Sequence, residues 1–482
     1  MRVAYLAAGA AGMYCGSCMH DHRLAAALRA AGRDVVLVPL YTPLRTDEDE
    51  IAAGPLYYGG LNVYLQQVSG LFRRLPRFID RVLDARPLLR LISHFAGATQ
   101  PEQLGELTLG TLAGPHGPQR KELRRLIDGL RPLRPDVVHL PNLMFVGIAR
   151  ALKDALGARI ACGLTGEDVF VDRLPEPYRG QAFELIRAGS ADCDAFLALT
   201  DYYARHATEH FGLPPARVQR ITMGIRAADF AAAGSEPRRS EPRPSGSGAA
   251  QSEPRRSEPR PSGSGADLPH TDRFLTGAAQ IPAQPAFVIG YLARICPEKG
   301  VDELVRAFIE LHGTGRDCRL RVAGWLGRAE RPFLQGLERV LRAAGIPADA
   351  WEYVGEPDRA GKIAFLHSLD VLCVPAAYRE AKGFYVLEAL AAGVPVVQPD
   401  HGAFSELIAA TGGGLLYPPG DTHALTTALA RLMDEPALRR QLAEGGQPAV
   451  RNGFTVERMA AEVWAIYERI AAGPGAHAPS GT

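Results

Sequence analysis

Short apolar runs that alternate with helix-forming stretches restrict most strongly how this chain can fold. The first run, Arg2 to Ala7, ends in the glycine loop Gly9 to Gly12; the helix-like stretch His22 to Gly32 and a second apolar run, Val35 to Leu40, follow. Strand, glycine loop, helix and strand in this order open a doubly wound parallel sheet. A second series of the same kind begins at Phe287. The sequence therefore predicts an α/β protein with two doubly wound domains facing each other across a cleft.

The composition changes abruptly near the middle of the chain. The segment SEPRRSEPRPSGSGA occurs at 235–249 and again, identically, at 252–266, and it carries too few apolar residues to form a core. A length of 482 residues also exceeds what one ordinary core organises. We expect five segments: a first α/β domain at 1–230, a disordered linker or insertion at 231–284, a second α/β domain at 285–455, a helix at 456–472 that packs back toward the first domain, and a disordered tail at 473–482.

Charge and cysteine usage limit the partners and the compartment. The net charge is +1 and 46% of the residues are hydrophobic, which gives no argument for a nucleic-acid partner. No run approaches the roughly 18 apolar residues of a membrane span, and glycines interrupt the apolar start of the chain. The seven cysteines are odd in number and scattered, as in proteins with reduced thiols. We expect a cytoplasmic protein.

A basic stretch at 71–95 leaves two interpretations open. Apolar residues alternate there with six arginines, and two prolines divide the stretch into short pieces. Such a surface is compatible with peripheral contact to anionic lipid on the inner face of the membrane. Solvated arginines over a hydrophobic face are the commoner case.

The glycine loop and the cysteines beside it also allow several interpretations. A dinucleotide site would need an acidic residue after the second strand, where this chain has Pro39, Leu40 and Tyr41, so Gly9 and Gly12 are better explained by close approach of a ligand to the backbone. A zinc site formed by Cys15, Cys18, His20 and His22 is imaginable, but ligands this crowded do not match the usual two well-separated pairs. Two interpretations of these cysteines remain: a redox-active pair, or two small side chains that line a loop. We favour the second.

Two glutamates eight positions apart mark a candidate ligand site. Glu380 precedes a predicted helix from Phe384 to Ala392, and Glu388 lies about one turn inside it. The amides near Gly383 and Phe384 lie at the start of this helix, where an anion is favoured. The two acids therefore flank a patch of donors that suits a phosphate.

Cations and further acids are expected to converge on the same edge of the second sheet. Arg294 and Lys299 share one strand-to-helix loop and suit a diphosphate, Arg as a fork and Lys as a point charge. The His401–Glu406 loop reaches the same edge. Carboxylates suit the hydroxyls of a ribose and of a sugar, so the set predicts a nucleoside diphosphate sugar. No Asp-x-Asp pair ends a strand, and we expect no metal and no other cofactor.

Several segments resemble the retaining, metal-independent glycosyltransferases of family 4, a group that includes glycogen synthases and mannosyltransferases. The matching segments are GYLARICPEKGVDELVRAF, LRVAGW, LDVLCVP, EAKGFYVLEALAAGVPVV, GAFSEL, LRPDVVHLPN and ITMGIRAADF. The resemblance implies the GT-B architecture, in which two Rossmann-like domains face each other across a cleft. It also implies transfer of a sugar with retention, the leaving phosphate taking the proton of the acceptor.

The resemblance assigns roles to the candidate residues. It implies that Glu380, Arg294 and Lys299 form the catalytic set, with Glu380 on the donor sugar and the two cations on the diphosphate. It further implies donor binding by Glu388 on the ribose, by the amides near Gly383 and Phe384, by the Gly9–Gly12 loop, and by Glu406.

The acceptor side departs from the family pattern. Many relatives carry a histidine after the fourth strand, where this chain has Thr165, Glu167 and Asp168, and we take these three as acceptor-side candidates. A glycan, a lipid-linked sugar and a small molecule all stay open as acceptor. The alternatives are another enzyme of this architecture, such as a phosphorylase or a nucleotide-sugar epimerase, or a catalytically inactive protein that still binds the sugar nucleotide.

Overall fold

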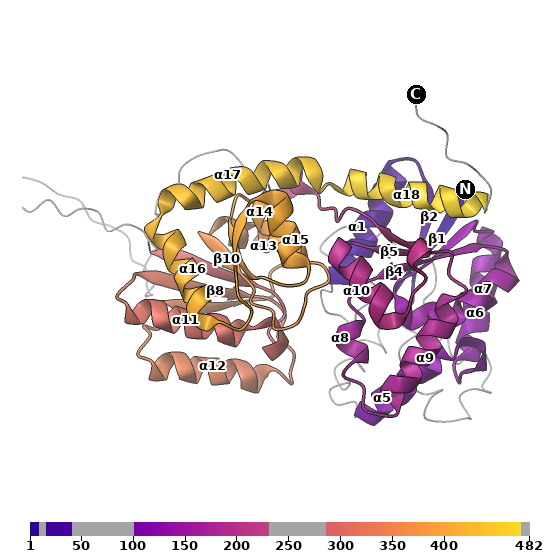
Figure 1. Ribbon diagram of the computed structural model, residues 1–482, viewed down its shortest axis with the longest axis horizontal. Coiled ribbons are helices and arrows are strands. Elements are labelled where there is room, and N and C mark those ends of the chain that lie inside the picture. The colour runs from indigo at the N-terminus through magenta and orange to yellow at the C-terminus, as the bar shows by residue number, and fades with distance from the viewer. Residues whose placement is uncertain (9–15, 41–100, 231–285, 474–482) are drawn as a thin grey trace, which may run out of the picture. The chain divides into compact units, whose positions relative to one another are not determined.

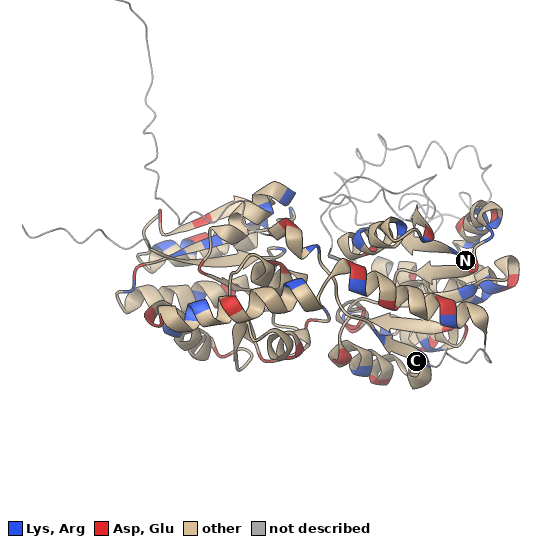
Figure 2. Cartoon of the chain, turned by 90° about the horizontal axis from the view of Figure 1, so that it is seen from above, with Lys and Arg blue, Asp and Glu red and all other residues tan. Residues whose placement is uncertain are grey.

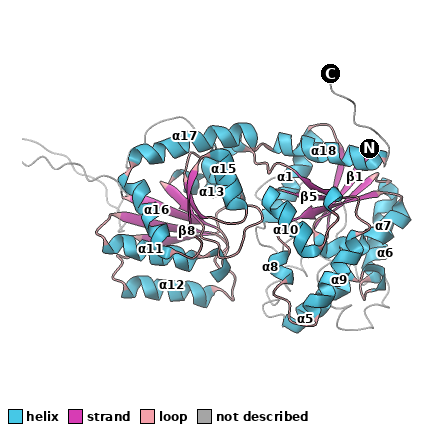
Figure 3. Ribbon diagram, viewed as in Figure 1, coloured by secondary structure: helices cyan, strands magenta, loops and turns pink. Residues whose placement is uncertain are grey.

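The computed structural model describes residues 1–8, 16–40, 101–230 and 286–473 (Figure 1). In these residues two parallel sheets of six strands each, flanked by helices, confirm the predicted α/β class (Figure 3). The described residues on both sides of the 231–285 gap belong to one compact unit. The linker predicted for 231–284 and all but the first residue of the tail predicted for 473–482 lie outside the described residues, and the domain boundaries stay predictions.

The first sheet is built from the N-terminal part of the chain. Its strands are β1 (Arg2–Ala7), β2 (Asp34–Pro39), β3 (Val137–Leu140), β4 (Arg159–Leu164), β5 (Ala195–Ala198) and β6 (Val218–Arg220). They lie in the order β2-β1-β3-β4-β5-β6, every neighbouring pair parallel. The α-helices of this part are α1 (Gly16–Ala30), α5 (Pro101–Leu112), α6 (Arg120–Leu130), α7 (Ala149–Leu156), α8 (Asp168–Val171), α9 (Tyr178–Ser190) and α10 (Asp201–Phe211), and short 3-10 turns include η2 (Arg131–Leu133) and η3 (Leu143–Ile148).

The second sheet repeats the same plan. Its strands are β7 (Phe287–Leu292), β8 (Cys318–Ala323), β9 (Trp351–Gly355), β10 (Val371–Cys373), β11 (Val396–Pro399) and β12 (Gly414–Tyr417). Their order is β12-β11-β10-β7-β8-β9, again all parallel. The helices are η6 (Pro297–Lys299), α11 (Val301–Gly313), α12 (Arg331–Ala343), α13 (Arg359–His367), α14 (Phe384–Ala391), α15 (Ala403–Thr411), α16 (Thr422–Asp434), α17 (Pro436–Gly453) and α18 (Val456–Ala472).

Alternation along the strands explains why both faces of each sheet are covered. Val3 and Tyr5 pack in one core with α1 and α18, whereas Ala4 and Leu6 pack in another with α6 and α7. In the second sheet Leu372 faces α13, α14 and α15, and Val371 faces α11, α12 and α16. Side chains that point alternately to two buried faces require the continuous apolar runs seen in the sequence. In both sheets the strand order reverses beside the first strand, β1 or β7, which is where doubly wound sheets bind ligands.

The predicted helix between the two glutamates is confirmed as α14. Gly383 precedes it with φ 109, and the backbone leaves the helix at Ala392 and Gly393, the latter with φ 78. Pro395 then excludes a further helical turn. The following strand, β11, starts at Val396, since Gly393 to Pro395 reverse the chain direction.

The last helix, α18, lies on the first sheet although it follows the second in sequence. Thr455 caps it, its hydroxyl oxygen accepting the N–H of Arg458 at 3.2 Å, as the sequence predicts. Its apolar stripe, which includes Met459, Val463 and Tyr467, is buried, and the helix packs against α1, β4 and β5. Glu462 accepts hydrogen bonds from the N–H of Thr222 at 2.5 Å and from its hydroxyl at 2.9 Å.

The first helix starts earlier than the sequence predicts. We expected a helix from His22, but α1 begins by Gly16, and Cys18 lies in it rather than in a loop. The helix contains a run of polar residues, His20 to Arg23, that nevertheless is buried, so apolar periodicity could not reveal it. Asp21 in this run accepts a hydrogen bond from the Tyr5 hydroxyl at 2.8 Å, which compensates its burial.

Charge is spread over the described helices rather than gathered on one face. In Figure 2 the positions of basic and acidic residues are interspersed along the helices seen from above. Among the described helices, none combines the length and apolar character that crossing a bilayer requires.

Candidate active site

A cavity of about 370 Å³ brings together most of the residues predicted to bind the donor. Its volume is in the range of small-molecule sites, roughly 300 to 1,000 Å³. The predicted residues in its lining are Arg294, Lys299, Glu380, Gly383, Phe384 and Glu388. Ser17 and Met19 from α1 and Thr165 from the loop after β4 also line it, so both halves of the chain contribute.

Glu380 is a buried carboxylate whose hydrogen bonds all end on one oxygen. Lys299 Nζ forms an ion pair with Oε2, and the hydroxyls of Tyr378 and Tyr385 donate to the same oxygen at 3.2 and 3.3 Å. Oε1 has no hydrogen-bond partner among the residues that the structure describes. Burial raises the pKa of this carboxyl, but Lys299, Lys382 and Tyr378 outweigh that effect and hold the pKa below its ordinary value of 4.5.

The two tyrosines remain hydrogen-bond donors to Glu380. Burial and the neighbouring Glu380 carboxylate raise the pKa of both phenols well above the ordinary value of 10.0. Lys299 Nζ also lies over their rings, 4.9 Å from the centroid of Tyr378 and 5.4 Å from that of Tyr385. A cation over two aromatic faces is held by their negative electrostatic potential. Glu380 and Lys299 are therefore oriented before any ligand arrives.

Glu388 is arranged in the same way. It is 3% exposed, and its Oε1 accepts hydrogen bonds from Arg23 Nη2 and from Lys362 Nζ, both at 3.1 Å. Oε2 has no such partner within the described ranges. Each of the two predicted glutamates is thus tied to a cation through one oxygen, and its other oxygen has no partner among the described residues.

The start of α14 supplies backbone donors between the two acids. Gly383 adopts φ 109, a left-handed conformation that only glycine tolerates well, and a Cβ there would lie 3.0 Å from Leu407 Cδ1. This turn leaves the first amides of α14 without carbonyl partners inside the helix. The helix dipole makes the same place favourable for an anion.

Only His401 and Gly402 of the predicted His401–Glu406 loop precede helix α15, and the start of this helix supports Glu380 through its backbone. The N–H of Ala403 donates to the Glu380 carbonyl oxygen at 2.8 Å. Gly402 makes this approach possible, because a Cβ there would come within 2.7 Å of the backbone N and O of Glu380. Glu406 itself does not line the cavity: its carboxylate accepts the N–H groups of Asp201 and Tyr202 at 3.1 and 3.0 Å, at the start of α10.

Of the three acceptor-side candidates, Thr165 lines the cavity and the other two do not. Thr165 lines the cavity, but Glu167 folds back on its own loop and accepts the N–H of Thr165 at 2.9 Å. Asp168 accepts a hydrogen bond from the Tyr203 hydroxyl at 2.8 Å and lies 3.2 Å from Nε2 of His206. Glu167 and Asp168 are outside the cavity lining, so the structure assigns them contacts that hold the loop after β4.

Other predictions fall on residues that the structure does not describe. Gly9, Gly12, Cys15 and the basic stretch 71–95 lie outside the described residues. Cys18 is a buried residue of α1. In the described part of the chain, no three His, Cys, Asp or Glu side chains come together as a set of metal ligands.

The sequence patterns do not single out the side chains of three cations in or beside the cavity: Lys362 and Lys382 line it, and Arg23 lies next to it through Glu388. Arg23 and Lys362 hold Glu388, and Lys382 Nζ donates to the Ser17 hydroxyl at 2.5 Å. Each of these cations is a single charge in an otherwise ordinary helix or loop. The two lysines carry one sequence signal, since few lysines occur in the sequence, but Arg23 carries none because arginines are common.

Two family models match the chain, one in the part that contains the first sheet and one in the part that contains the second. The family model described as Glycosyltransferase Family 4 matches residues 105–229, and the model described as Glycosyl transferases group 1 matches residues 278–448. The second match contains the whole Arg294-to-Glu406 region of the candidate site.

Individual relatives agree with the family models. The chain is 32% identical over 201 residues to a phosphatidyl-myo-inositol mannosyltransferase of Mycobacterium leprae, an alignment covering 41% of this chain and 51% of the relative, so the chain spans about half the length of this curated relative.

Solved structures share the fold. A sucrose-phosphate synthase from Thermosynechococcus elongatus superposes with a TM-score of 0.64 at 17% identity, covering 98% of this chain and all of the other. The Anabaena protein HepE in complex with UDP superposes with a TM-score of 0.62 at 12% identity, covering 97% of this chain and all of the other. At these identities the likeness shows the GT-B fold. The two family models, which together match more than half of the chain, show that the chain belongs to the family 4 glycosyltransferases.

Proposed function

We propose that this chain transfers a sugar from a nucleoside diphosphate sugar to an acceptor hydroxyl, with retention at the anomeric carbon and without a metal ion. The observation that carries the proposal is the matched pair of glutamates in one cavity. Each is held by a cation through one oxygen, and each keeps its second oxygen without a partner among the described residues. A sugar and a ribose offer two sets of hydroxyls, and the start of α14 lies between the two acids.

The remaining groups suit the diphosphate that joins the two sugars. Arg294 and Lys299 reach the cavity from the loop after β7, and they supply positive charge together with the amides of α14. In the proposed step the bond between the anomeric carbon and the phosphate oxygen breaks, and the acceptor oxygen bonds to the same face of that carbon. The acceptor proton passes to the leaving phosphate. Charge that develops on this phosphate is stabilised by groups already oriented toward it.

Nucleotide binding is the first test. Thermal unfolding should be shifted upward by at least one of UDP, GDP and ADP, with UDP measured first because the HepE neighbour holds it. Lys299→Ala should lower the affinity for that nucleotide by about tenfold, because one charge-assisted contact is lost. Glu444→Ala, an exposed glutamate on α17, is the control and should bind as the wild type does. If none of the three nucleotides stabilises the protein, the donor site is wrong.

Transfer is tested separately from binding. Glu380→Ala should abolish transfer and the slow hydrolysis of the donor, while nucleotide binding stays close to that of the wild type. A screen of donor sugars for release without acceptor identifies the sugar. The anomeric configuration of the product, followed by NMR, tests retention, and activity after treatment with a chelator tests independence from metal. If Glu380→Ala still transfers sugar, Glu380 is not part of the catalytic set. That result would indicate that the protein binds the donor in a different way.

A further inference from the structure

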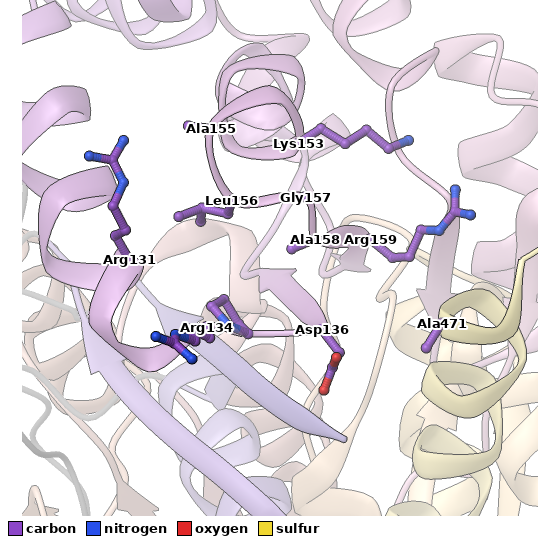
Figure 4. Close-up of a pocket in the computed structure, with 11 residues that line it drawn as sticks. Arg131, Arg134, Asp136, Lys153, Ala155, Leu156, Gly157, Ala158, Arg159 and Ala471 are labelled. Carbon is purple, nitrogen blue, oxygen red and sulfur yellow. The ribbon is translucent and has the colours of Figure 1, made fainter.

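A second cavity lies at the opposite end of the first sheet. It has a volume of about 630 Å³ and is formed where η2 leads into β3 and where α7 leads into β4 (Figure 4). The strands are parallel, so this cavity is at their amino ends, whereas Thr165 and the donor cavity follow the carboxyl end of β4. Nothing in the proposed transfer reaction uses it.

Positive charge dominates the lining of this cavity. Four of its residues are cationic, Arg131, Arg134, Lys153 and Arg159, and one is acidic, Asp136. Figure 4 shows Arg131 and Arg134 on one side of the cavity and Lys153 and Arg159 on the other. The cations come from three separate elements, so their convergence is a property of the fold and not of one basic run.

The four cations differ in how far they are neutralised. Lys153 and Arg159 share Asp194, at 3.0 and 3.5 Å. Arg131 lies 4.0 Å from Asp128, and both side chains are about half exposed or more, so water screens this pair. The Arg134 side chain has no hydrogen-bond or ion-pair partner among the described residues. One side of the cavity therefore carries two arginines with little compensation.

Arg134 also occupies an unusual backbone position. Its φ of 46 and ψ of 58 are left-handed, and it is the one non-glycine residue with positive φ in the described ranges. Glycine is the residue that usually ends a helical turn in this conformation. The backbone conformation therefore does not explain why this residue is an arginine. Its side chain lines the cavity, and a role there would explain it.

We propose that this cavity binds a phosphate-bearing anion, independently of the donor site. The volume suits a small molecule or the headgroup of a lipid, and arginine forks match phosphate oxygens in pairs. Arg131 and Arg134 make the main contacts, because Asp194 holds Lys153 and Arg159. The group that the cavity recognises is a phosphate. This phosphate belongs either to a soluble metabolite or to a lipid headgroup of an anionic membrane.

The variants follow from the geometry. Arg134→Gly removes the cation and leaves the backbone in a conformation that glycine prefers, so the variant should fold at least as stably as the wild type. It is combined with Arg131→Gln. Arg451→Gln, an exposed arginine on α17, is the matched control. All proteins also carry Lys299→Ala and Arg294→Ala, which weaken phosphate binding in the donor cavity.

Calorimetric titration of the full chain with inorganic pyrophosphate tests the soluble source. The double variant should bind at least about tenfold more weakly than its parent, and the control should match the parent. Co-sedimentation with vesicles of phosphatidylcholine and phosphatidylglycerol in equal amounts tests the membrane source, with neutral phosphatidylcholine vesicles as reference. Loss of binding in the double variant, in either arm, supports the proposal and identifies the source. Equal binding by the double variant and its parent, or no binding by the parent in both arms, overturns it.

Discussion

Glu388 illustrates why residues of the candidate site are also structural residues. A buried carboxylate is costly unless charges and hydrogen bonds compensate it, and here Arg23 and Lys362 do so. Removing the acid leaves two cations facing each other in a place that water hardly reaches. A loss of activity in such a variant therefore has two possible causes, and stability must be measured beside binding.

The first prediction separates these causes. Glu388→Gln keeps the shape of the side chain but removes its charge, and it should lower the free energy of unfolding by about 3 kcal/mol, as expected when one partner of a buried ion pair is lost. Urea denaturation measures this change, with Glu444→Gln as the exposed control. A variant as stable as the wild type would show that Arg23 and Lys362 do not depend on Glu388.

His139 gives a prediction about acid stability. Its ring stacks on Tyr5 with centroids 4.2 Å apart, and its Nδ1 shares a hydrogen bond of 2.8 Å with the hydroxyl of Tyr467. Burial, with a smaller effect of His20, lowers the pKa of His139 from 6.5 to about 3. The folded state therefore keeps this imidazole neutral at a pH where the unfolded state protonates it.

The sign of the effect follows from this difference. Below pH 6.5 the unfolded chain binds the extra proton, so stability falls as the pH falls toward 3, with a limiting slope of about 1.4 kcal/mol per pH unit from this residue. Above pH 6.5 the contribution is flat. Urea denaturation at a series of pH values should show a smaller slope in His139→Gln than in the wild type. Identical slopes would mean that another group causes the acid lability.

At the scale of elements, α14 and the loops around it contain most of the candidate site. The helix, its glycine start and the two flanking acids were predictable because all of these signals are local in sequence. The positions of Arg294 and Lys299 were predictable because doubly wound sheets bring the loops after parallel strands to one edge. The confirmed cap at Thr455 is likewise a local signal.

What could not be predicted depends on contacts distant in sequence. The family resemblance places Glu406 in the donor site, and the start of its helix does reach Glu380, but its carboxylate accepts the N–H groups at the start of α10. Glu167 and Asp168 follow a strand end, as ligand-binding acids do, and yet their oxygens are taken up by their own loop and by Tyr203. A side chain's direction decides these cases, and the sequence pattern does not give it.

The start of α14 gives the third prediction. Gly383→Ala places a Cβ at φ 109 and 3.0 Å from Leu407, which should cost about 1 to 2 kcal/mol of stability and displace the donor amides, so that nucleotide affinity falls. Gly412→Ala is the matched control: it has φ 63 at the end of α15 and open space around its Cβ. It should lose stability but keep nucleotide affinity. Equal loss of affinity in both variants would argue against amide contacts at α14.

At the scale of the whole molecule, α18 completes the first sheet from the far end of the chain. It buries Val463 and Tyr467 against the core that includes Tyr5 and Leu24. A chain ending after residue 455 should expose this surface, bind a hydrophobic dye and lose its cooperative unfolding transition. A chain ending after residue 473 keeps the helix and should unfold as the full chain does. If the shorter chain unfolds cooperatively at the same temperature, α18 is dispensable.

The position of α18 has a consequence during synthesis on the ribosome. The strands of the first sheet all emerge by residue 220, but the helix that covers one of its faces starts at residue 456. A nascent chain therefore carries an uncovered apolar face beside α1 while more than half of the protein is still being made. Chaperones that bind exposed apolar surface should associate with this intermediate and leave once the last helix has emerged.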